Sequence, residues 1–264
     1  MAWRAWRRRD SRGVPNMTRP ASLWQIPAAP VSLPLDTVHV WRADLDVAPE
    51  TLRSLQDTLS TDEQVRAAKF CASIDRNRYA AGRGILRALL AQYLGTPAGT
   101  LQFCLNPHGK PSLMPAGEIQ SLRFNVSHSR GLALFAFAFR RDVGVDVEYL
   151  RAFDRMDRLA EQYFSAQEIT ALRALPISDR IEAFFRCWTR KEAYIKARGR
   201  GLSISLASFT VSLAPEELSN LPITSEEDPE AGRWSVRGLN AGSGYAGAVV
   251  AEGADWSPVL WQWT

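Results

Sequence analysis

The chain has 264 residues, of which 46% are hydrophobic and 23% are charged, as is typical of a soluble folded protein. Its longest apolar run, residues 132–139, is far shorter than the roughly 20 residues that a membrane-spanning helix needs. The net charge is +4, but residues 1–12 alone hold five arginines against one aspartate, and the rest of the chain is balanced. We therefore expect a soluble, cytoplasmic protein with no membrane or nucleic-acid partner.

The basic tail is rich in arginine and poor in acidic residues, as transit peptides are, but it lacks the apolar segment of a secretory signal. Because Met17 follows closely, residues 1–16 are alternatively an over-long start of the protein. The three cysteines have no CxxC spacing, and the chain has only three histidines. This composition argues against a disulfide framework and a zinc site, and it favours a reducing compartment.

Residues 1–35 are predicted to form a flexible, basic and proline-containing extension, followed by a first lobe over residues 36–142. A capping box of Ser60 and Glu63 predicts a helix that ends near residue 70. A longer helix is predicted over residues 75–94, where Gly95 ends it. Alternating apolar residues predict the strands of this lobe at 38–41, 101–103, 122–128 and 132–139.

A similar pattern of strands and a long helix predicts a second lobe over residues 143–264. Ser165 and Glu168 form a second capping box, and a long helix is predicted from Asp179 to about Ala197. Predicted strands lie at 143–148, 208–213, 234–237, 245–251 and 259–263. The fold class is therefore α+β, with two similar lobes, each with a small antiparallel sheet and a long helix, and with a cleft between them.

The strand at residues 143–148 carries two carboxylates on one face. Side chains alternate along a strand, so Asp146 and Glu148 point to one side while three valines point to the other. Two carboxylates on one face are suited to bind a hard cation through oxygen. The alternative is an amphipathic strand with a solvated acidic face.

A third carboxylate, Glu192, falls inside an apolar stripe of the long helix. Helical spacing places Glu192 between Trp188 and Ile195, and Lys196 lies one turn further on. A carboxylate that faces a core is costly unless it is paired or bound to a metal ion. The alternative is a buried ion pair that only joins the lobes.

The first lobe holds candidate anion ligands on a turn, at a strand end and along its helices. Lys110 and Pro111 follow a Gly109 turn, and Ser127 and His128 end a strand. Basic residues on the helices are suited to bind phosphate or, alternatively, are solvated arginines of an ordinary surface. They are Arg66, Arg76, Arg78, Arg83 and Arg87.

Taken together, these motifs resemble the 4′-phosphopantetheinyl transferases of the monomeric, two-lobed kind, similar to the activators of peptide and polyketide synthases. The resemblance covers roughly residues 38–252. The matching motifs, in chain order, are Gly109-Lys110-Pro111, Asn125-Val126-Ser127-His128, Gly144-Val145-Asp146-Val147-Glu148, Trp188-Thr189-Arg190-Lys191-Glu192-Ala193-Tyr194-Ile195-Lys196 and Gly199-Arg200-Gly201-Leu202. One departure is Ile74, where relatives often have a basic residue.

This resemblance implies lobes related by a pseudo-twofold axis, with coenzyme A and Mg²⁺ (or Mn²⁺ in its place) in the cleft. It implies that Asp146, Glu148 and Glu192 ligate the metal and that Lys196 contacts the pyrophosphate. The residues implied to bind the 3′-phosphate and neighbouring parts of coenzyme A are Arg66, Arg78, Arg83, Lys110, Pro111, Ser127 and His128.

The reaction implied is attack by a carrier-protein serine on the β-phosphorus of coenzyme A, with release of 3′,5′-ADP. Asp146, Glu192 and Lys196 are the catalytic candidates, with Glu192 or a water that it holds as the general base. The partner implied is an acidic acyl or peptidyl carrier domain, and the enzyme is expected to be a monomer. Countercharge for that partner, or alternatively a solvated helix face, is expected from Arg186, Arg190, Lys191, Arg198 and Arg200.

Three competing functions share some of these features. A magnesium-dependent hydrolase or kinase would use the same carboxylates, but the phosphate-binding GxxxxGK[ST] loop is missing from the sequence. A nucleic-acid-binding protein would depend on the arginine tail. An inactive relative that binds coenzyme A would not need the complete set of carboxylates.

Overall fold

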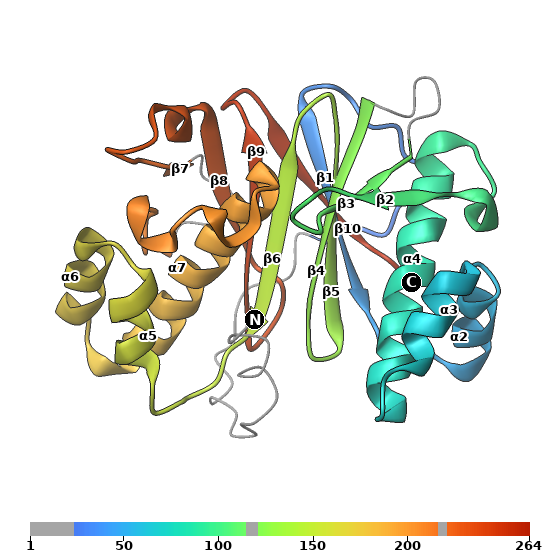
Figure 1. Cartoon of the computed structure of the whole chain (residues 1–264), viewed down its shortest axis with the longest axis horizontal. Coiled ribbons are helices and arrows are strands. Elements are labelled where there is room, and N and C mark those ends of the chain that lie inside the picture. The colour runs from blue at the N-terminus through green and yellow to red at the C-terminus, as the bar shows by residue number, and fades with distance from the viewer. Residues whose placement is uncertain (1–23, 115–120, 216–220) are drawn as a thin grey trace. The chain divides into compact units, whose positions relative to one another are not determined.

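The computed structural model describes residues 24–114, 121–215 and 221–264 (Figure 1). The described chain divides into two compact units, one of residues 24–144 with Asp255–Thr264 and the other of Val145–Ala254. Each unit combines helices with a four-stranded sheet, which confirms the predicted α+β class. The pseudo-twofold axis and the cleft concern the placement of one unit against the other, and they stay predictions.

The unit of residues 24–144 is built on a sheet with the strand order β10-β1-β5-β4. β1 runs parallel to β10 and antiparallel to β5, and β4 pairs antiparallel with β5. The strands are β1 (Thr37–Asp44), β4 (Leu122–Ser129), β5 (Leu132–Phe139) and β10 (Ser257–Gln262), with a separate ribbon of β2 (Phe103–Leu105) and β3 (Pro111–Leu113). The helices are α2 (Pro49–Gln56), α3 (Thr61–Ala68), α4 (Ser73–Leu94) and the 3₁₀ turn η1 (Ala98–Thr100).

The core of this unit lies between the long helix α4 and the sheet. Ile85 and Leu89 of α4 share one buried cluster with Trp41 of β1 and Phe135 of β5. The helix ends where predicted because Gly95 adopts a left-handed conformation, with φ at +61°, that favours glycine. The described part of the predicted extension also joins this unit, since the backbone N–H of Gln25 donates to the carbonyl of Leu260 in β10.

The unit of Val145–Ala254 has a sheet with the strand order β6-β9-β8-β7. Its strands are β6 (Val143–Tyr149), which begins two residues before the unit boundary, β7 (Leu221–Pro222), β8 (Trp234–Leu239) and β9 (Tyr245–Glu252). Its helices are α5 (Met156–Tyr163), α6 (Ala166–Ala174) and α7 (Ile177–Arg198), with 3₁₀ turns η3 (Gly201–Ser203), η4 (Leu206–Ser208) and η5 (Pro229–Arg233).

The 22-residue helix α7 packs on β8 and β9, and α5 and α6 lie against it (Figure 1). Phe184, Phe185 and Trp188 lie in the buried cluster of this unit, so the apolar stripe predicted for the helix faces the core. Gly199, with φ at +64°, ends the helix in the left-handed conformation. Among the described residues, no helix has the length and apolar character needed to cross a membrane.

The structure differs from the sequence-based elements in several places. The segment predicted as a strand at 208–213 is mostly extended but forms only one isolated bridge among the described residues, from Thr210 to Thr224. Several of its other backbone carbonyls bond to side chains and not to a neighbouring strand. The final strand β10 pairs with β1, whereas the predicted second lobe ran to residue 264. The short helices α2 and α5 were not predicted, since neither begins with a capping box.

Candidate active site

Asp146 and Glu148 lie on one face of β6, and both are fully buried. That face is turned towards α7, because Nζ of Lys196 lies 2.6 Å from Oδ1 of Asp146 and also donates to the carbonyl of Val145 at 3.3 Å. The alternative interpretation, that this strand has a solvated acidic face, is therefore wrong. A fully buried carboxylate needs a compensating positive charge, and Lys196 supplies one at Asp146.

Glu192 is 4% exposed, as its place in the apolar stripe predicts. It precedes Lys196 by one turn of α7, so the two side chains leave the helix on the same side. Glu192 and Lys196 come from one helix, and Asp146 and Glu148 come from one strand of the same unit. The predicted acidic and basic residues of this unit are thus carried by two elements that touch.

The chemistry of these side chains suits a hard cation, because carboxylate oxygens are the ligands that Mg²⁺ prefers. Within residues 24–114, 121–215 and 221–264, the structure contains no group of three or more Asp, Glu, His or Cys side chains arranged to hold a metal ion. The metal-ligating role of Asp146, Glu148 and Glu192 therefore stays a prediction.

The basic residues expected to attract a carrier protein are mostly used inside the unit. Arg190 and Lys191 are 1% and 0% exposed, and they donate to the carbonyls of Ser212 and Phe209. Arg186, Arg198 and Arg200 complete the predicted set. Arg186 pairs with Glu182 and Arg198 with Asp228, whereas Arg200 is exposed. The prediction that this helix has a solvent-facing basic surface is therefore wrong for Arg190 and Lys191, because both side chains are buried and donate to backbone carbonyls.

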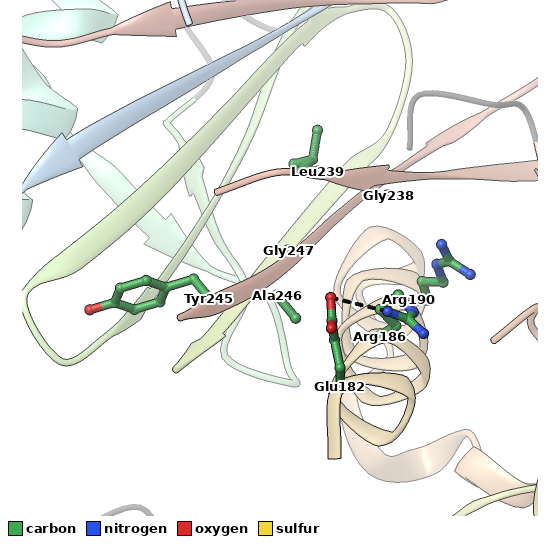
Figure 2. A pocket seen from close by; sticks show the side chains of 8 residues that line it. All are labelled: Glu182, Arg186, Arg190, Gly238, Leu239, Tyr245, Ala246 and Gly247. Atoms are coloured by element: carbon green, nitrogen blue, oxygen red, sulfur yellow. Dashed lines mark ion pairs between the residues drawn. The ribbon is translucent and has the colours of Figure 1, made fainter. Parts of the chain in front are cut away.

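A small pocket lies between α7 and the ends of β8 and β9, and Figure 2 shows Glu182, Arg186 and Arg190 on its helical side. Its volume is about 20 Å³, which is room for a single water molecule. The dashed line in Figure 2 marks the Arg186–Glu182 ion pair at 3.2 Å. None of the predicted site residues lines this pocket, so it is separate from the candidate active site.

In the unit of residues 24–144, the turn before Lys110 is closed by Asn106. Its side-chain oxygen accepts from the backbone N–H groups of His108 and Lys110 at 2.9 Å each, and Gly109 has φ at +84°. The Nζ of Lys110 donates to the carbonyl of Val143 at 3.2 Å. Burial lowers the pKa of Lys110 to about 8, although the nearby Asp142 carboxylate opposes this shift. Pro111 follows directly as the first residue of β3.

Ser127 and His128 lie at the end of β4, and they point to opposite faces because side chains alternate along a strand. Ser127 is 4% exposed, whereas His128 is exposed. Of the two side chains, His128 is therefore the more accessible to solvent.

The three arginines predicted to bind phosphate have different surroundings. Arg78 forms a bidentate ion pair with Asp46, with 2.7 Å from Nε to Oδ1 and 2.6 Å from Nη2 to Oδ2. Arg83 pairs with Glu63, whose carboxylate also binds the buried Arg87. Arg66 is exposed, with its guanidinium 5.8 Å from the centre of the Tyr79 ring. Two of the three are thus engaged with carboxylates of the same unit.

Glu168, which the sequence predicts only as part of a helix cap, has a second role. Glu168 is 1% exposed, and its Oε2 accepts from the backbone N–H of Ser165, as a capping box requires. It also binds Lys191, with Nζ at 2.7 Å from Oε1. The sequence signal for the cap is local, whereas the contact with Lys191 depends on how α6 packs on α7.

Comparison with known proteins now identifies the family. Residues 142–250 match the family model described as the 4′-phosphopantetheinyl transferase superfamily, and residues 46–139 match the one described as 4′-phosphopantetheinyl transferase, N-terminal. The 4′-phosphopantetheinyl transferase HetI of Nostoc sp. is 39% identical over 228 residues, which cover 86% of this chain and 93% of that protein. The chain belongs to the 4′-phosphopantetheinyl transferase superfamily.

Two further members of the superfamily are less similar in sequence. The 4′-phosphopantetheinyl transferase psf-1 of Bacillus pumilus is 30% identical over 182 residues, which cover 69% of this chain and 76% of the relative. The 4′-phosphopantetheinyl transferase Sfp of Bacillus subtilis is 24% identical over 212 residues, covering 80% and 90%. The chain is therefore an enzyme of the transferase class, and Asp146, Glu148, Glu192 and Lys196 lie inside the segment that matches the superfamily model.

Proposed function

We propose that this transferase moves the 4′-phosphopantetheine arm of coenzyme A to a serine hydroxyl of an apo acyl or peptidyl carrier protein. The observation that carries the proposal is the contact of Lys196 with Asp146, one helical turn from the buried Glu192. These residues lie within the part of the chain that matches the superfamily model. In the reaction, a bond forms between the serine oxygen and the β-phosphorus, the bond to the bridging oxygen breaks, and 3′,5′-ADP leaves.

Lys196 is proposed to neutralise the charge that develops on the leaving phosphate. Its ammonium group is fixed by Asp146 and by the carbonyl of Val145, so little reorganisation is needed when negative charge appears beside it. Lys196 is also partly open to solvent, with 23% of its side chain exposed, whereas Asp146 behind it is fully buried. Lys196 is therefore the member of the pair that we propose an anionic substrate approaches.

Glu192 is proposed to accept the serine proton, either directly or through a water molecule that it holds. A general base must be unprotonated and within hydrogen-bond reach of the proton that it removes. Glu192 is buried and precedes Lys196 by one turn of α7, so the two side chains leave the helix on the same side. Glu192 thus offers the proposed reaction a buried carboxylate on the same side of the helix as Lys196.

Mg²⁺ is the proposed metal, with Asp146, Glu148 and Glu192 as its protein ligands. When bound, it would add positive charge beside the diphosphate of coenzyme A. The support for this part of the proposal is the chemistry of the donors, which are oxygen ligands held on two packed elements. Mn²⁺ has the same preference for oxygen and is expected to replace it.

For the unit of residues 24–144, we propose that Lys110, Ser127, His128 and Arg66 bind the phosphate groups of coenzyme A. Lys110 is held by a closed turn that Pro111 stiffens, and Arg66 and His128 are open to solvent. Arg78 and Arg83 would have to share their guanidinium groups with Asp46 and Glu63. We therefore assign them a smaller part in binding than the other residues.

We further propose that the enzyme acts as a monomer in the cytoplasm and that its carrier domain is acidic. The arginine tail, on which a nucleic-acid-binding function would depend, lies outside the described residues. Arg200 is the exposed member of the basic set at the end of α7, and it offers a positive charge to a carrier. The proposal therefore needs no broad basic surface.

The test is mass spectrometry of a panel of apo carrier proteins incubated with the enzyme, coenzyme A and Mg²⁺. The expected result is a gain of one phosphopantetheine group per carrier with the wild-type enzyme. Asp146→Asn should abolish this gain. The matched control is Glu161→Gln, which neutralises an exposed carboxylate in the same unit and should act like wild type. Transfer by Asp146→Asn at the wild-type rate would refute the proposed site.

A further inference from the structure

The extended segment of residues 209–214 is held to α7 by side chains from that helix. Arg186 Nε donates to the carbonyl of Leu213 at 3.1 Å. Arg190 donates to two carbonyls, those of Ser212 at 2.6 Å and Ala214 at 2.9 Å. Lys191 Nζ donates to the carbonyl of Phe209 at 2.6 Å and lies 4.3 Å from the centre of that residue's ring. Basic side chains thus satisfy carbonyl groups that a neighbouring strand would otherwise satisfy.

Glu168 connects the same segment to α6. One oxygen, Oε1, accepts from the backbone N–H of Val211 at 2.8 Å and from Lys191 Nζ at 2.7 Å. The other, Oε2, accepts from the backbone N–H of Ser165 at 2.7 Å and also lies 2.7 Å from Lys191 Nζ. The carboxylate therefore joins the start of α6, the extended segment and α7 through four contacts.

The ion pair of Glu168 and Lys191, which joins three elements, carries a large desolvation cost because both charges are buried. Neither Glu168 nor Lys191 has any side-chain exposure, and burial lowers the pKa of Lys191. A well-packed apolar pair of similar size often stabilises a fold as well as a buried ion pair does. What an apolar pair lacks is direction, since it allows a helix to rotate or slide by a small amount. Buried polar pairs are known to fix registry in other helical proteins.

Registry matters here because the ion pair and the candidate active site lie on opposite sides of the same helix turns. At 100° per residue, the mean direction of Arg190 and Lys191 lies about 170° from that of Glu192 and Lys196 around the axis of α7. One side contacts the segment of residues 209–214, and the other contacts β6 through Asp146. Any rotation of α7 that the first side permits would move Glu192 and Lys196 relative to β6.

We propose that Glu168, Arg190 and Lys191 are positioning residues of the transfer reaction, which fix the rotation of α7 and so the placement of Glu192 and Lys196 against β6. They act through the helix and do not touch the reacting groups. The inference rests on the proposed function for its kinetic consequence, but its structural consequence can be measured without any transfer assay.

The kinetic test compares two double variants in which an ion pair becomes an apolar pair of similar shape. Glu168→Leu with Lys191→Met removes the buried pair. Glu161→Leu with Arg173→Met is the matched control, because it removes an exposed pair between α5 and α6 in the same unit. We expect kcat to fall by ~tenfold or more in the first variant, with less than a twofold change in KM for coenzyme A, since a small misplacement of catalytic groups costs rate. The control should keep both constants.

The structural test measures the coupling free energy between Lys196 and Asp146. It is obtained from a double-mutant cycle of Lys196→Met and Asp146→Asn, with the stability of each variant measured by urea unfolding. The cycle is run in the wild-type background and in the variant that lacks the buried pair. We expect the coupling to fall by at least half in that variant. An unchanged coupling would overturn the positioning role even if transfer were lost, and wild-type kcat in that variant would overturn it as well.

Arg190→Met provides a second variant, which loses the bonds to Ser212 and Ala214 and leaves the buried pair in place. If the double variant does not fold, kcat and the coupling of Lys196 to Asp146 are measured in Arg190→Met in its place. The same losses are expected, and an unchanged coupling or a wild-type kcat would again overturn the positioning role. Failure of the proposed function has a different signature: the wild-type enzyme would modify no carrier, while the coupling of Lys196 to Asp146 would still depend on the buried pair.

Discussion

Nζ of Lys196 lies 2.6 Å from Oδ1 of Asp146, and this contact joins the helix α7 to the strand β6. The carboxylate is fully buried, whereas 23% of the Lys196 side chain is exposed, so Lys196 is the more accessible member of the pair. The same contact fixes which face of β6 is turned towards α7. The fold and the proposed chemistry therefore depend on the same two residues.

Lys196→Met is expected to affect both stability and transfer. The substitution leaves the buried Asp146 without its ammonium partner, which should cost about 3 kcal/mol of unfolding free energy in urea. The transfer rate should fall ~100-fold or more, because the charge on the leaving phosphate loses its neutralising group. Lys196→Arg, which keeps the charge, is the control and should retain most of the stability. An unfolding midpoint for Lys196→Met equal to that of wild type would contradict this account of the pair.

Glu148→Gln is expected to weaken metal binding without unfolding the protein. Gln keeps the size of the side chain but removes the charge that attracts a divalent cation. Mn²⁺ binding, followed by electron paramagnetic resonance without substrate, should become at least tenfold weaker. Glu182→Gln on α7 is the control, because that carboxylate lies outside the proposed ligand set. Equal Mn²⁺ affinity in wild type and Glu148→Gln would remove Glu148 from the metal site.

The pKa of Lys110, lowered to about 8 by burial, predicts a pH-dependent KM for coenzyme A. Lys110 is mostly charged at pH 7 and mostly neutral at pH 9, so its attraction for phosphate is lost as the pH rises through 8. KM should therefore increase several-fold between pH 7 and pH 9. Lys110→Arg keeps its charge over this range and should reduce the increase, whereas exposed Lys69→Arg should not. The same increase in all three proteins would exclude Lys110 from phosphate binding.

Two glycines of α4 give a matched test of the fold. A Cβ at Gly84 would lie 2.5 Å from the Cβ and 2.8 Å from the carbonyl oxygen of Leu55 in α2, so Gly84→Ala must push the helices apart. We expect a loss of about 2 kcal/mol in urea unfolding. A Cβ at Gly82 would lie 3.6 Å from Leu45 Cδ2, an ordinary contact, and Gly82→Ala should stabilise the helix by up to about 1 kcal/mol. Equal effects of the two variants would contradict the close packing of α2 on α4.

The parts of the site that the sequence could predict are those set by local periodicity. The alternation of β6 placed Asp146 and Glu148 on one face, and the spacing of α7 placed Glu192 in the apolar stripe, where it is 4% exposed. Gly95 and Gly199 marked the ends of both long helices for the same local reason. These features need only the geometry of one element.

The parts that could not be predicted depend on contacts between distant residues. Arg190 and Lys191 look like solvated helix residues in the sequence, and only the approach of residues 209–214 makes them buried donors. The pairing of Arg78 with Asp46 joins residues 32 positions apart. The extended segment itself was predicted as a strand because its apolar alternation is the same whether its backbone bonds to a strand or to side chains.

We propose that Glu192 takes part in the chemistry and is more than a buried structural carboxylate. The most direct test of this proposal is the single-turnover rate of transfer to an apo carrier, with coenzyme A bound at saturation, for wild type and Glu192→Gln. We expect a rate at least 100-fold lower for Glu192→Gln, with an unchanged urea midpoint. A single-turnover rate equal to that of wild type would contradict it.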